Sequence, residues 1–193
     1  NLFARDVCCF WEDRGEVRMQ LKPHAPGIRK FSEQALTAKA RTIIKSMRAS
    51  KDSGKAVMFY SCIIGSIPGQ TATAIKVADT FVRSLRERLD QVFIINPAEY
   101  FEPGMDGDDL MFMWEQVQRS GLINIWRFQS MEDIEASFGL MGLKVPPVWS
   151  GKDATFSTGC TKEMRIALDM QQRHREMPII GPDPEQFFRR RDY

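Results

Sequence analysis

The arrangement of hydrophobic and polar residues predicts a strand, a helix and a second strand in the first half of the chain. Residues 55–64 form a short apolar run rich in residues that favour β structure, so we expect a buried strand there. Farther along, apolar residues recur at the three- and four-residue spacing of an amphipathic helix: Ile75, Ala78, Val82, Leu85 and Leu89. Residues 91–96 predict the next strand. Together these segments form a βαβ unit, which indicates an α/β fold.

Further helices and one more strand are expected around this unit. Helical patterns cover residues 32–49, 106–120, 130–138 and 161–175, and residues 122–128 are typical of a strand. Ser32 is expected to cap the first of these helices, which we place before the domain proper. Ser130 and Asp133 would form a capping box, and Gly139 and Gly142 would end the helix that they begin.

The two ends of the chain lack such periodicity. Residues 1–30 predict an extended arm. The tail contains three prolines, so we expect it to be extended rather than helical and to bind a partner through Phe187, Phe188, Arg189, Arg190 and Arg191. The expected organisation is an N-terminal arm and helix (1–52), a domain (53–176) that contains an insertion (121–144), and a C-terminal tail (177–193).

Composition and charge exclude several classes of protein. The chain has 193 residues, 43% hydrophobic and 27% charged, and no apolar run reaches the roughly 18 residues of a membrane helix. We therefore expect one globular domain with extensions that does not span a membrane. A net charge of +2 is too balanced for a dedicated nucleic-acid-binding protein. The cysteines show neither metal-ligand spacing nor a disulfide pattern, which favours a reducing intracellular compartment.

Residues 145–164, VPPVWSGKDATFSTGCTKEM, resemble the second half of a glutaredoxin, a family with the thioredoxin fold. In that family a Val-Pro with a cis proline precedes a strand, a Gly-Lys turn, a second strand and a Gly-Gly-Cys-Asp sequence that opens the last helix. The matching residues are Val145-Pro146, Gly151-Lys152 and Thr158-Gly159-Cys160-Thr161, and Phe59-Tyr60-Ser61 resembles the end of the first glutaredoxin strand. The resemblance implies a three-layer thioredoxin-like domain with a cis Pro146 followed by a β-hairpin.

The resemblance also implies that the redox chemistry has been lost. Gly65 and Pro68 stand where glutaredoxins have their nucleophilic and resolving cysteines, so we expect no catalytic residue, no cofactor and no metal. Cys62 and Cys160 are expected to be buried structural residues rather than nucleophiles. A vestigial glutathione-type site would consist of Gly65, Val145, Pro146, Gly159 and Cys160.

Two other patterns suggest different chemistry. Residues 65–73, GSIPGQTAT, resemble a phosphate-binding P-loop between a strand and a helix. Thr71-Ala72-Thr73 stands where such a loop has Gly-Lys-Ser/Thr, so the phosphate-binding lysine is absent. The acidic run from Asp106 to Asp109 suggests metal binding, but a calcium loop needs additional spaced oxygen ligands and a distal glutamate, so we prefer to interpret the run as a helix cap.

We therefore predict a non-catalytic, glutaredoxin-like accessory subunit of a large intracellular assembly. The chain begins at Asn1 without a methionine, and either removal of a transit peptide or trimming would produce this start. In the first case we expect other subunits as partners, in a membrane complex such as mitochondrial ATP synthase or a respiratory complex. Two alternatives stay open: a glutathione-dependent thiol oxidoreductase or transferase that uses Cys62 or Cys160, and a degenerate P-loop regulator that binds a nucleotide.

Overall fold

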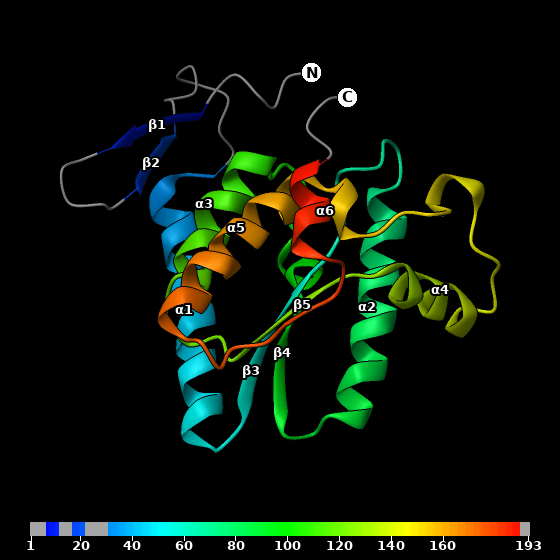
Figure 1. Ribbon diagram of the computed structural model, residues 1–193, viewed down its shortest axis with the longest axis horizontal. Helices are drawn as coiled ribbons and strands as arrows, with labels where there is room; N and C mark the ends of the chain where they lie inside the picture. The colour runs from blue at the N-terminus through cyan, green and yellow to red at the C-terminus, as the bar shows by residue number, and fades with distance from the viewer. Residues whose placement is uncertain (1–6, 12–16, 22–30, 190–193) are drawn as a thin grey trace.

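The computed structural model describes residues 31–189 and, upstream of them, the backbone of two short strands. β1 (Val7–Trp11) and β2 (Val17–Leu21) pair antiparallel as a separate two-stranded sheet (Figure 1). The N-terminal arm that we expected to be extended thus contains a pair of strands.

A four-stranded parallel sheet forms the centre of the domain. Its strands are β3 (Ala56–Ser61), β4 (Val92–Ile95), β5 (Ile125–Phe128) and β6 (Ile179–Ile180), in the order β4-β3-β5-β6. Each neighbouring pair is parallel. β3 is buried from its second residue onward, as expected for a central strand covered on both faces. The predicted βαβ unit and the α/β class are confirmed.

Helices cover both faces of this sheet (Figure 1). One face is covered by α1 (Glu33–Asp52), α3 (Gly107–Gln118) and α5 (Thr158–Arg173), and the other by α2 (Thr71–Arg88) and α4 (Met131–Leu140). α6 (Pro184–Arg189) packs on α5 and on the 3-10 turn Ala154–Phe156. The domain therefore has three layers. No helix in the described part of the chain is both long and apolar enough to cross a bilayer.

The alternation of side chains along β3 divides the core between the two faces. Phe59 points toward α3, and its ring centre lies 5.5 Å from that of Trp114 and 5.1 Å from that of Trp126. Tyr60, the next residue, points to the opposite face and stacks on Phe81 of α2 at 5.5 Å. Such aromatic pairs add about 0.5–1.5 kcal/mol beyond the area that they bury. The two halves of the core are thus fixed by neighbouring residues of one strand.

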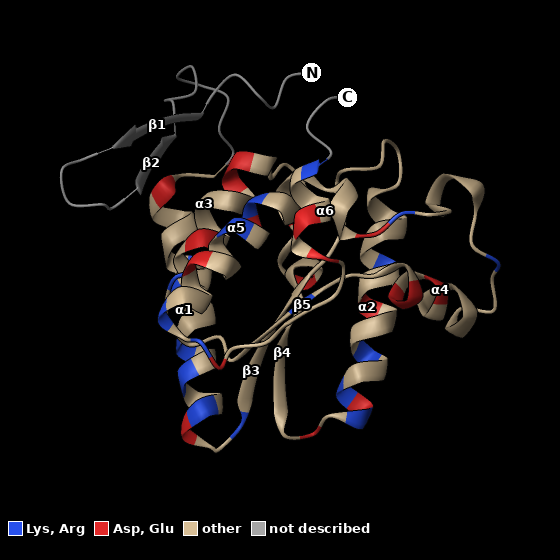
Figure 2. Cartoon of the chain, in the orientation of Figure 1, with Lys and Arg blue, Asp and Glu red and all other residues tan. Residues whose placement is uncertain are grey.

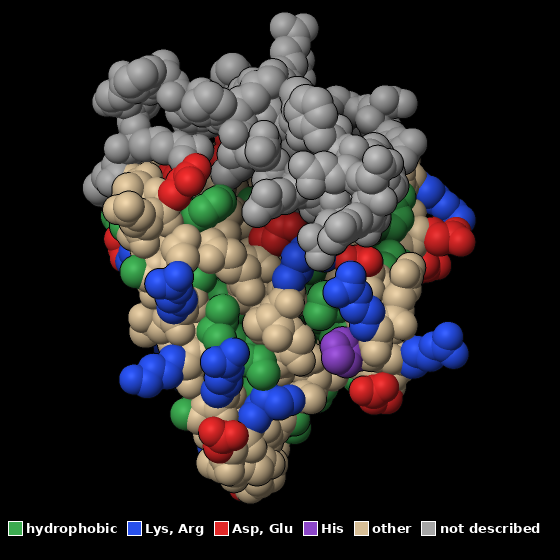
Figure 3. Space-filling model, turned by 90° about the vertical axis from the view of Figure 1, so that its left-hand side faces the viewer, with side chains coloured by type: hydrophobic (Ala, Val, Ile, Leu, Met, Phe, Trp, Pro, Cys, Tyr) green, Lys and Arg blue, Asp and Glu red, His purple; other side chains and the backbone are tan. Residues whose placement is uncertain are grey.

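α1 is part of the domain rather than a helix that precedes it. Ser32 caps it as predicted, because the Ser32 hydroxyl accepts a hydrogen bond from the Ala35 N–H. The helix expected over residues 32–49 is confirmed, and its apolar face packs in the main core, with Leu36, Ala40, Ile43 and Met47 buried and Ile44 partly buried beside them. Its exposed residues include Arg41, Lys45 and Arg48, and Figure 3 shows basic side chains on this side of the molecule.

The segment expected to be an insertion, residues 121–144, belongs to the sheet. The strand predicted over residues 122–128 is confirmed as β5, but it lies inside the sheet between β3 and β6. It pairs with the last four residues of β3. A strand of four residues is too short for its hydrophobic pattern to reveal whether it lies at the edge or in the interior.

The predicted starts of α3 and α4 are confirmed, and of the two glycines expected to end α4, Gly142 follows the helix whereas Gly139 lies inside it. Asp106 and Asp109 form a capping box at the start of α3, so the acidic run caps a helix as we interpreted it. Ser130 and Asp133 form a second capping box at the start of α4. Gly142 follows the end of α4 with a φ of 71°, a left-handed conformation that favours glycine.

Two predictions drawn from the glutaredoxin resemblance are wrong. The described residues contain no cis peptide bond, so the bond before Pro146 is trans. No hairpin follows it, because Pro147–Trp149 and Ala154–Phe156 form 3-10 turns instead of strands. Proline has no N–H to donate to a strand ladder. The N–H groups of Trp149 and Ser150 instead donate to the Pro146 carbonyl, which folds the chain into a turn.

The C-terminal segment, expected to be extended, adds a strand and a helix to the domain. β6 pairs with β5, and the Trp126 N–H donates to the Pro178 carbonyl at 3.0 Å. α6 begins at Pro184, because a proline in the first turn of a helix sacrifices no helical hydrogen bond. The Phe187 ring is buried against Phe128, with 5.2 Å between ring centres. Phe187 therefore belongs to the core and is not available to a partner.

Replacing Phe187 with alanine tests whether this segment is part of the folded core. We expect Phe187→Ala to lower the free energy of unfolding by ~3 kcal/mol, since truncation of a buried phenylalanine removes apolar contacts and leaves a cavity. Phe188→Ala is the matched control and should cost only about 1 kcal/mol, because Phe188 is half-buried. Urea denaturation followed by tryptophan fluorescence measures both losses. Equal losses in the two variants would contradict this packing.

Candidate functional site

The carboxyl end of β3 is the place in this fold where a ligand site is expected. The chain crosses from β3 to β4 on one side and then passes to β5 on the other, so the direction of winding reverses there. Parallel sheets usually bind ligands at such a reversal, outside the carboxyl ends of the strands. The loops that meet there are residues 62–70, the 3-10 turn Pro97–Tyr100 and residues 129–130.

Four polar side chains are buried together beneath this edge. Ser61 ends β3, Gln118 ends α3, and Cys160 and Glu163 lie near the start of α5. Each is at most 8% exposed. Gln118 Nε2 donates to Glu163 Oε2 at 2.8 Å. We call these four residues the Glu163 cluster.

Burial makes the Glu163 carboxyl a weak acid. Loss of contact with water raises its pKa to about 8, and the nearby Ser61 hydroxyl and Gln118 amide oppose this shift only in part. Glu163 is therefore largely protonated at neutral pH, so it is able to donate a hydrogen bond as well as accept one. Within the described residues, neither the Ser61 hydroxyl nor Gln118 Oε1 makes a hydrogen bond of ordinary geometry.

The thiols of Cys62 and Cys160 are also held in their protonated form. Burial raises the pKa of Cys160 to about 12, with a further contribution from the Glu163 carboxyl. Burial likewise raises the pKa of Cys62 well above its usual range. The thiolate is the nucleophilic form of cysteine. The predicted burial of both residues is confirmed, and this burial favours the protonated thiol over the thiolate at both positions.

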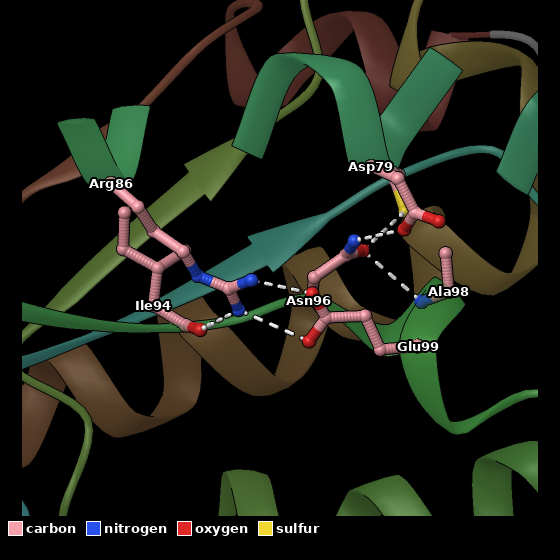
Figure 4. A network of polar contacts seen from close by, with 7 residues as sticks. Asp79, Arg86, Ile94, Asn96, Ala98 and Glu99 are labelled. Atoms are coloured by element: carbon pink, nitrogen blue, oxygen red, sulfur yellow. Dashed lines mark hydrogen bonds and ion pairs between the residues drawn. The ribbon is translucent and has the colours of Figure 1, made fainter. Parts of the chain in front are cut away.

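A second polar network fastens the turn after β4 to α2 (Figure 4). Asn96 Nδ2 donates to Asp79 Oδ1 at 2.7 Å, and Asn96 Oδ1 accepts from the Ala98 N–H at 3.1 Å. Beside it, Arg86 donates to both carboxylate oxygens of Glu99, at 2.5 and 3.0 Å. Both polar atoms of the Asn96 side chain are thus used locally, which indicates a structural role.

A third network anchors the start of loop 62–70 and the start of α4. Gln129 Oε1 accepts from the Ile63 N–H at 3.1 Å. The Arg127 guanidinium pairs with the Asp133 carboxylate at 2.7 Å, and the Tyr60 hydroxyl donates to the same carboxylate at 3.4 Å. Burial raises the pKa of Tyr60 well above its usual range, so its hydroxyl keeps the proton that it donates. These contacts tie α4 and the loop to the sheet.

The residues predicted for a vestigial glutathione-type site fall in two separate places. Gly65 is exposed in the loop after β3, and Val145 packs on the hydrophobic cluster that this loop forms with α2 and α4. Pro146 is half-buried next to it. Gly159 and Cys160 begin α5, and Cys160 belongs to the main core. The structure thus brings Val145 to the loop that holds Gly65, and it does not bring Cys160 into the same cluster.

The residues predicted to contact a partner are divided in a similar way. Phe187 is buried and Phe188 is half-buried. Arg189 is exposed and pairs with an acidic residue one turn earlier in α6, at 2.5 Å. Arg190 and Arg191 lie outside the described residues. Of this expected surface, the described part comprises Arg189 and one side of Phe188.

Glu163 is the candidate that the sequence analysis missed. The buried face of α5 includes Cys160, Met164 and Ala167, and Glu163 falls within that apolar stripe. A charged residue on the apolar face of a helix is a signal that could have identified it, since buried carboxyl groups are rare without a partner. Its partner Gln118 lies 45 residues earlier, so no local pattern could have paired the two.

Comparison with known proteins identified no protein similar to this chain. No family model matches the chain, and neither a curated protein nor a solved structure matches it. Among residues 31–189 and the two upstream strands, no group of three or more His, Cys, Asp or Glu side chains is placed to hold a metal ion. The functional interpretation therefore depends on the geometry of the described residues.

Replacing Glu163 with glutamine tests its protonation state through the pH dependence of stability. The folded protein keeps the proton up to a pKa of about 8, while the unfolded chain loses it near 4.5, the ordinary value. As pH rises from 4.5 to 8, the free energy of unfolding should therefore fall by up to about 1.4 kcal/mol per pH unit on account of this group. Above that range its contribution is constant. Glu163→Gln should remove this fall.

Urea denaturation of wild type and Glu163→Gln between about pH 5 and pH 9 measures the effect. The variant should gain stability over wild type progressively up to about pH 8. Glu87→Gln, on the exposed side of α2, is the matched control and should follow the wild-type profile. A Glu163→Gln difference that is the same at every pH would show that the carboxyl does not titrate with a raised pKa.

Proposed function

We propose that this protein is a non-catalytic, glutaredoxin-like accessory subunit whose α/β domain serves as a scaffold within a larger intracellular assembly. The observation that carries the proposal is the burial of Cys62 and Cys160, which raises the pKa of both thiols. Both residues lie near the carboxyl end of β3, where a parallel sheet usually binds its ligand. A thiol-dependent enzyme needs an accessible thiolate. The resemblance to glutaredoxins places Gly65 and Pro68 where the reactive cysteines would be.

The polar groups at the strand ends support the same proposal. Asn96 and Asp133 each use their side-chain hydrogen bonds on the backbone or side chains of neighbouring elements, and Gln129 Oε1 accepts from the Ile63 N–H. Groups used in this way hold loops in place and leave little capacity for a substrate. The Glu163 cluster is enclosed by β3, α3 and α5, so its carboxyl is not presented to solvent.

The assignment of the domain to the thioredoxin-like folds is part of the proposal as well. The unit β3–α2–β4 supports a thioredoxin-like origin, since it matches the first half of that fold in order and in its Phe59-Tyr60-Ser61 strand end. The second half departs from the glutaredoxin pattern through its 3-10 turns and its parallel β5 and β6. A mitochondrial complex such as ATP synthase or a respiratory complex is the assembly that we propose, on the balanced charge of the chain.

The reactivity of the thiols tests the non-catalytic proposal. In a Cys8→Ser/Cys9→Ser background, the remaining thiols should react with a disulfide reagent at least ~100-fold more slowly in the folded protein than in denaturant, because burial suppresses both access and ionisation. The rate of release of the coloured leaving thiol at neutral pH measures this. Rapid reaction of Cys62 or Cys160 in the folded state would instead favour a glutathione-dependent oxidoreductase or transferase.

Membership of an assembly is tested by recovering the endogenous protein under mild detergent and identifying co-purifying proteins by mass spectrometry. Recovery at fixed stoichiometry within one large complex supports the scaffold and names its compartment. Recovery without stoichiometric partners would overturn it.

A second candidate, a degenerate P-loop regulator, is favoured by the surroundings of the first turn of α2. The all-parallel sheet places loop 62–70 between its first strand and this helix, as in phosphate-binding folds. Gln70, the N-cap of α2, makes no side-chain capping bond, and the first turn contains no acidic residue that would repel an anion.

Nucleotide binding is tested by thermal unfolding with and without magnesium ATP. The scaffold proposal predicts an unchanged melting temperature at about 1 mM nucleotide, since Thr71-Ala72-Thr73 lacks the P-loop lysine. A rise of several degrees that Thr73→Ala abolishes would favour the regulator instead.

A further inference from the structure

The outer face of α1 is a basic surface that the proposed function does not use. The helix lies at one side of the domain and packs on α3 and β3 through its apolar face (Figure 1). Arg41, Lys45 and Arg48 are exposed. Their spacing of four and three residues places them on one face of the helix. We call these three residues the α1 row.

No acidic residue of α1 lies between the members of this row. The two acidic residues of the helix stand at its ends, Glu33 and Asp52, and Figure 2 shows basic side chains along the helix between them. The ion pairs of the described residues use other basic side chains, such as Lys39, which pairs with Glu102. Among the described residues, the α1 row therefore presents positive charge to solvent without an acidic partner.

This arrangement of charges is unfavourable for the helix itself. Arg41 and Lys45 are four residues apart, and Lys45 and Arg48 are three apart, so like charges repel each other along the row. The helix dipole does not offset this repulsion, because its effect is confined to the last turn, where the basic residue is Lys51. A local arrangement that costs stability is typical of a functional surface.

The other exposed residues of α1 indicate which kind of anion the row fits. The core of a protein interface is enriched in aromatic residues, and single-stranded nucleic acid stacks on them. A net charge of +2 is too small for a dedicated duplex-binding protein. A surface of anionic lipid headgroups requires only accessible basic groups. Between its acidic ends, the remaining exposed residues of α1 are uncharged and include no aromatic one: Gln34, Ala35, Ala38, Thr42, Ser46 and Ala49.

We propose that the α1 row binds the anionic lipid headgroups of a membrane surface. From Arg41 to Arg48 the row extends about 10 Å along the helix axis. The exposed residues around the row are mostly small, so its three long side chains project beyond them and meet headgroup phosphates on one plane. No large apolar side chain of this face enters the bilayer, so the binding is weak and sensitive to salt. This property belongs to the chain alone and does not depend on the assembly proposed above.

The proposal is tested by sedimenting the purified chain with vesicles of equal parts phosphatidylcholine and phosphatidylserine, and with vesicles of phosphatidylcholine alone. Wild type should bind the anionic vesicles only, and added salt should release it, because salt screens exposed charges. Arg41→Gln/Lys45→Gln/Arg48→Gln should bind about 100-fold more weakly, since each basic residue near an anionic surface contributes roughly a factor of five. This variant should melt no lower than wild type, because glutamine is a comparable helix former and the repulsion along the row is gone.

A triple variant on α2 is the matched control. Lys76, Arg83 and Arg88 are also exposed, but α2 covers the other face of the sheet, and it carries Asp79 and Glu87 among its basic residues. Lys76→Gln/Arg83→Gln/Arg88→Gln removes the same net charge as the α1 variant. It should bind the anionic vesicles as wild type does, because the α1 row is intact.

Three results would overturn the proposal. They are a wild type that does not prefer anionic vesicles, an α1 variant that binds them as wild type does, and an equal loss of affinity in the two triple variants, which would assign the binding to net charge. A wild type that binds beads of polyglutamate instead of vesicles would also overturn it and would assign the α1 row to an acidic protein segment. Because the purified chain is used alone, these results do not depend on recovery of a larger complex.

Discussion

The hydrogen bonds of Gln129 connect three segments that lie far apart in the sequence. Its N–H donates to the Ser61 carbonyl at 2.8 Å, and its own carbonyl accepts from the Ala154 N–H at 2.8 Å. Its side-chain oxygen accepts from the Ile63 N–H. One fully buried residue therefore fixes β3, the end of β5 and the turn that leads into α5 relative to one another. Each of these backbone groups would lose its partner without it, at a cost typical of buried unpaired polar groups.

The two sides of this connection have different physical characters. On one side, the Glu163 cluster places an acid in the core, and keeping it protonated avoids the larger cost of a buried charge. On the other side, the ion pair of Arg127 and Asp133 holds α4 against the sheet, with the Asp133 side chain 4% exposed. The buried Glu163 carboxyl makes the stability of the core depend on pH. The ion pair keeps α4 attached to the sheet although the last turn of this helix exposes Leu140.

Local patterns predicted much of this structure, and long-range ones were missed. The helical spacing that ends at Met47 and the capping boxes at Asp106 and Ser130 depend on a few neighbouring residues, so the sequence was sufficient for them. The pairing of β5 with β3, and of β6 with β5, joins strands that are far apart along the chain. No local period encodes such pairing. The candidate site was missed for the same reason, because Glu163 meets Gln118 only after α3 and α5 have packed.

Two of the wrong predictions came from the interpretation of prolines. Pro146 and Pro147 suggested a cis bond and a strand, but consecutive residues without an N–H favour a turn. Pro184 suggested an extended tail, although the same lack of an N–H is harmless in the first turn of α6. In both places, the effect of the missing proline N–H depends on whether the surrounding structure requires a hydrogen-bond donor at that position.

The placement of β6 and α6 has a consequence for the order in which the protein forms during synthesis. Trp126 and Phe128 reach their final packing only when residues 178–187 arrive, some fifty positions later in the chain. Gly181 passes so close to β5 that an added Cβ would lie 2.5 Å from the Phe128 carbonyl oxygen, so this late segment must fit a nearly finished surface. Until it leaves the ribosome, one edge of the sheet and two aromatic rings stay open to other chains.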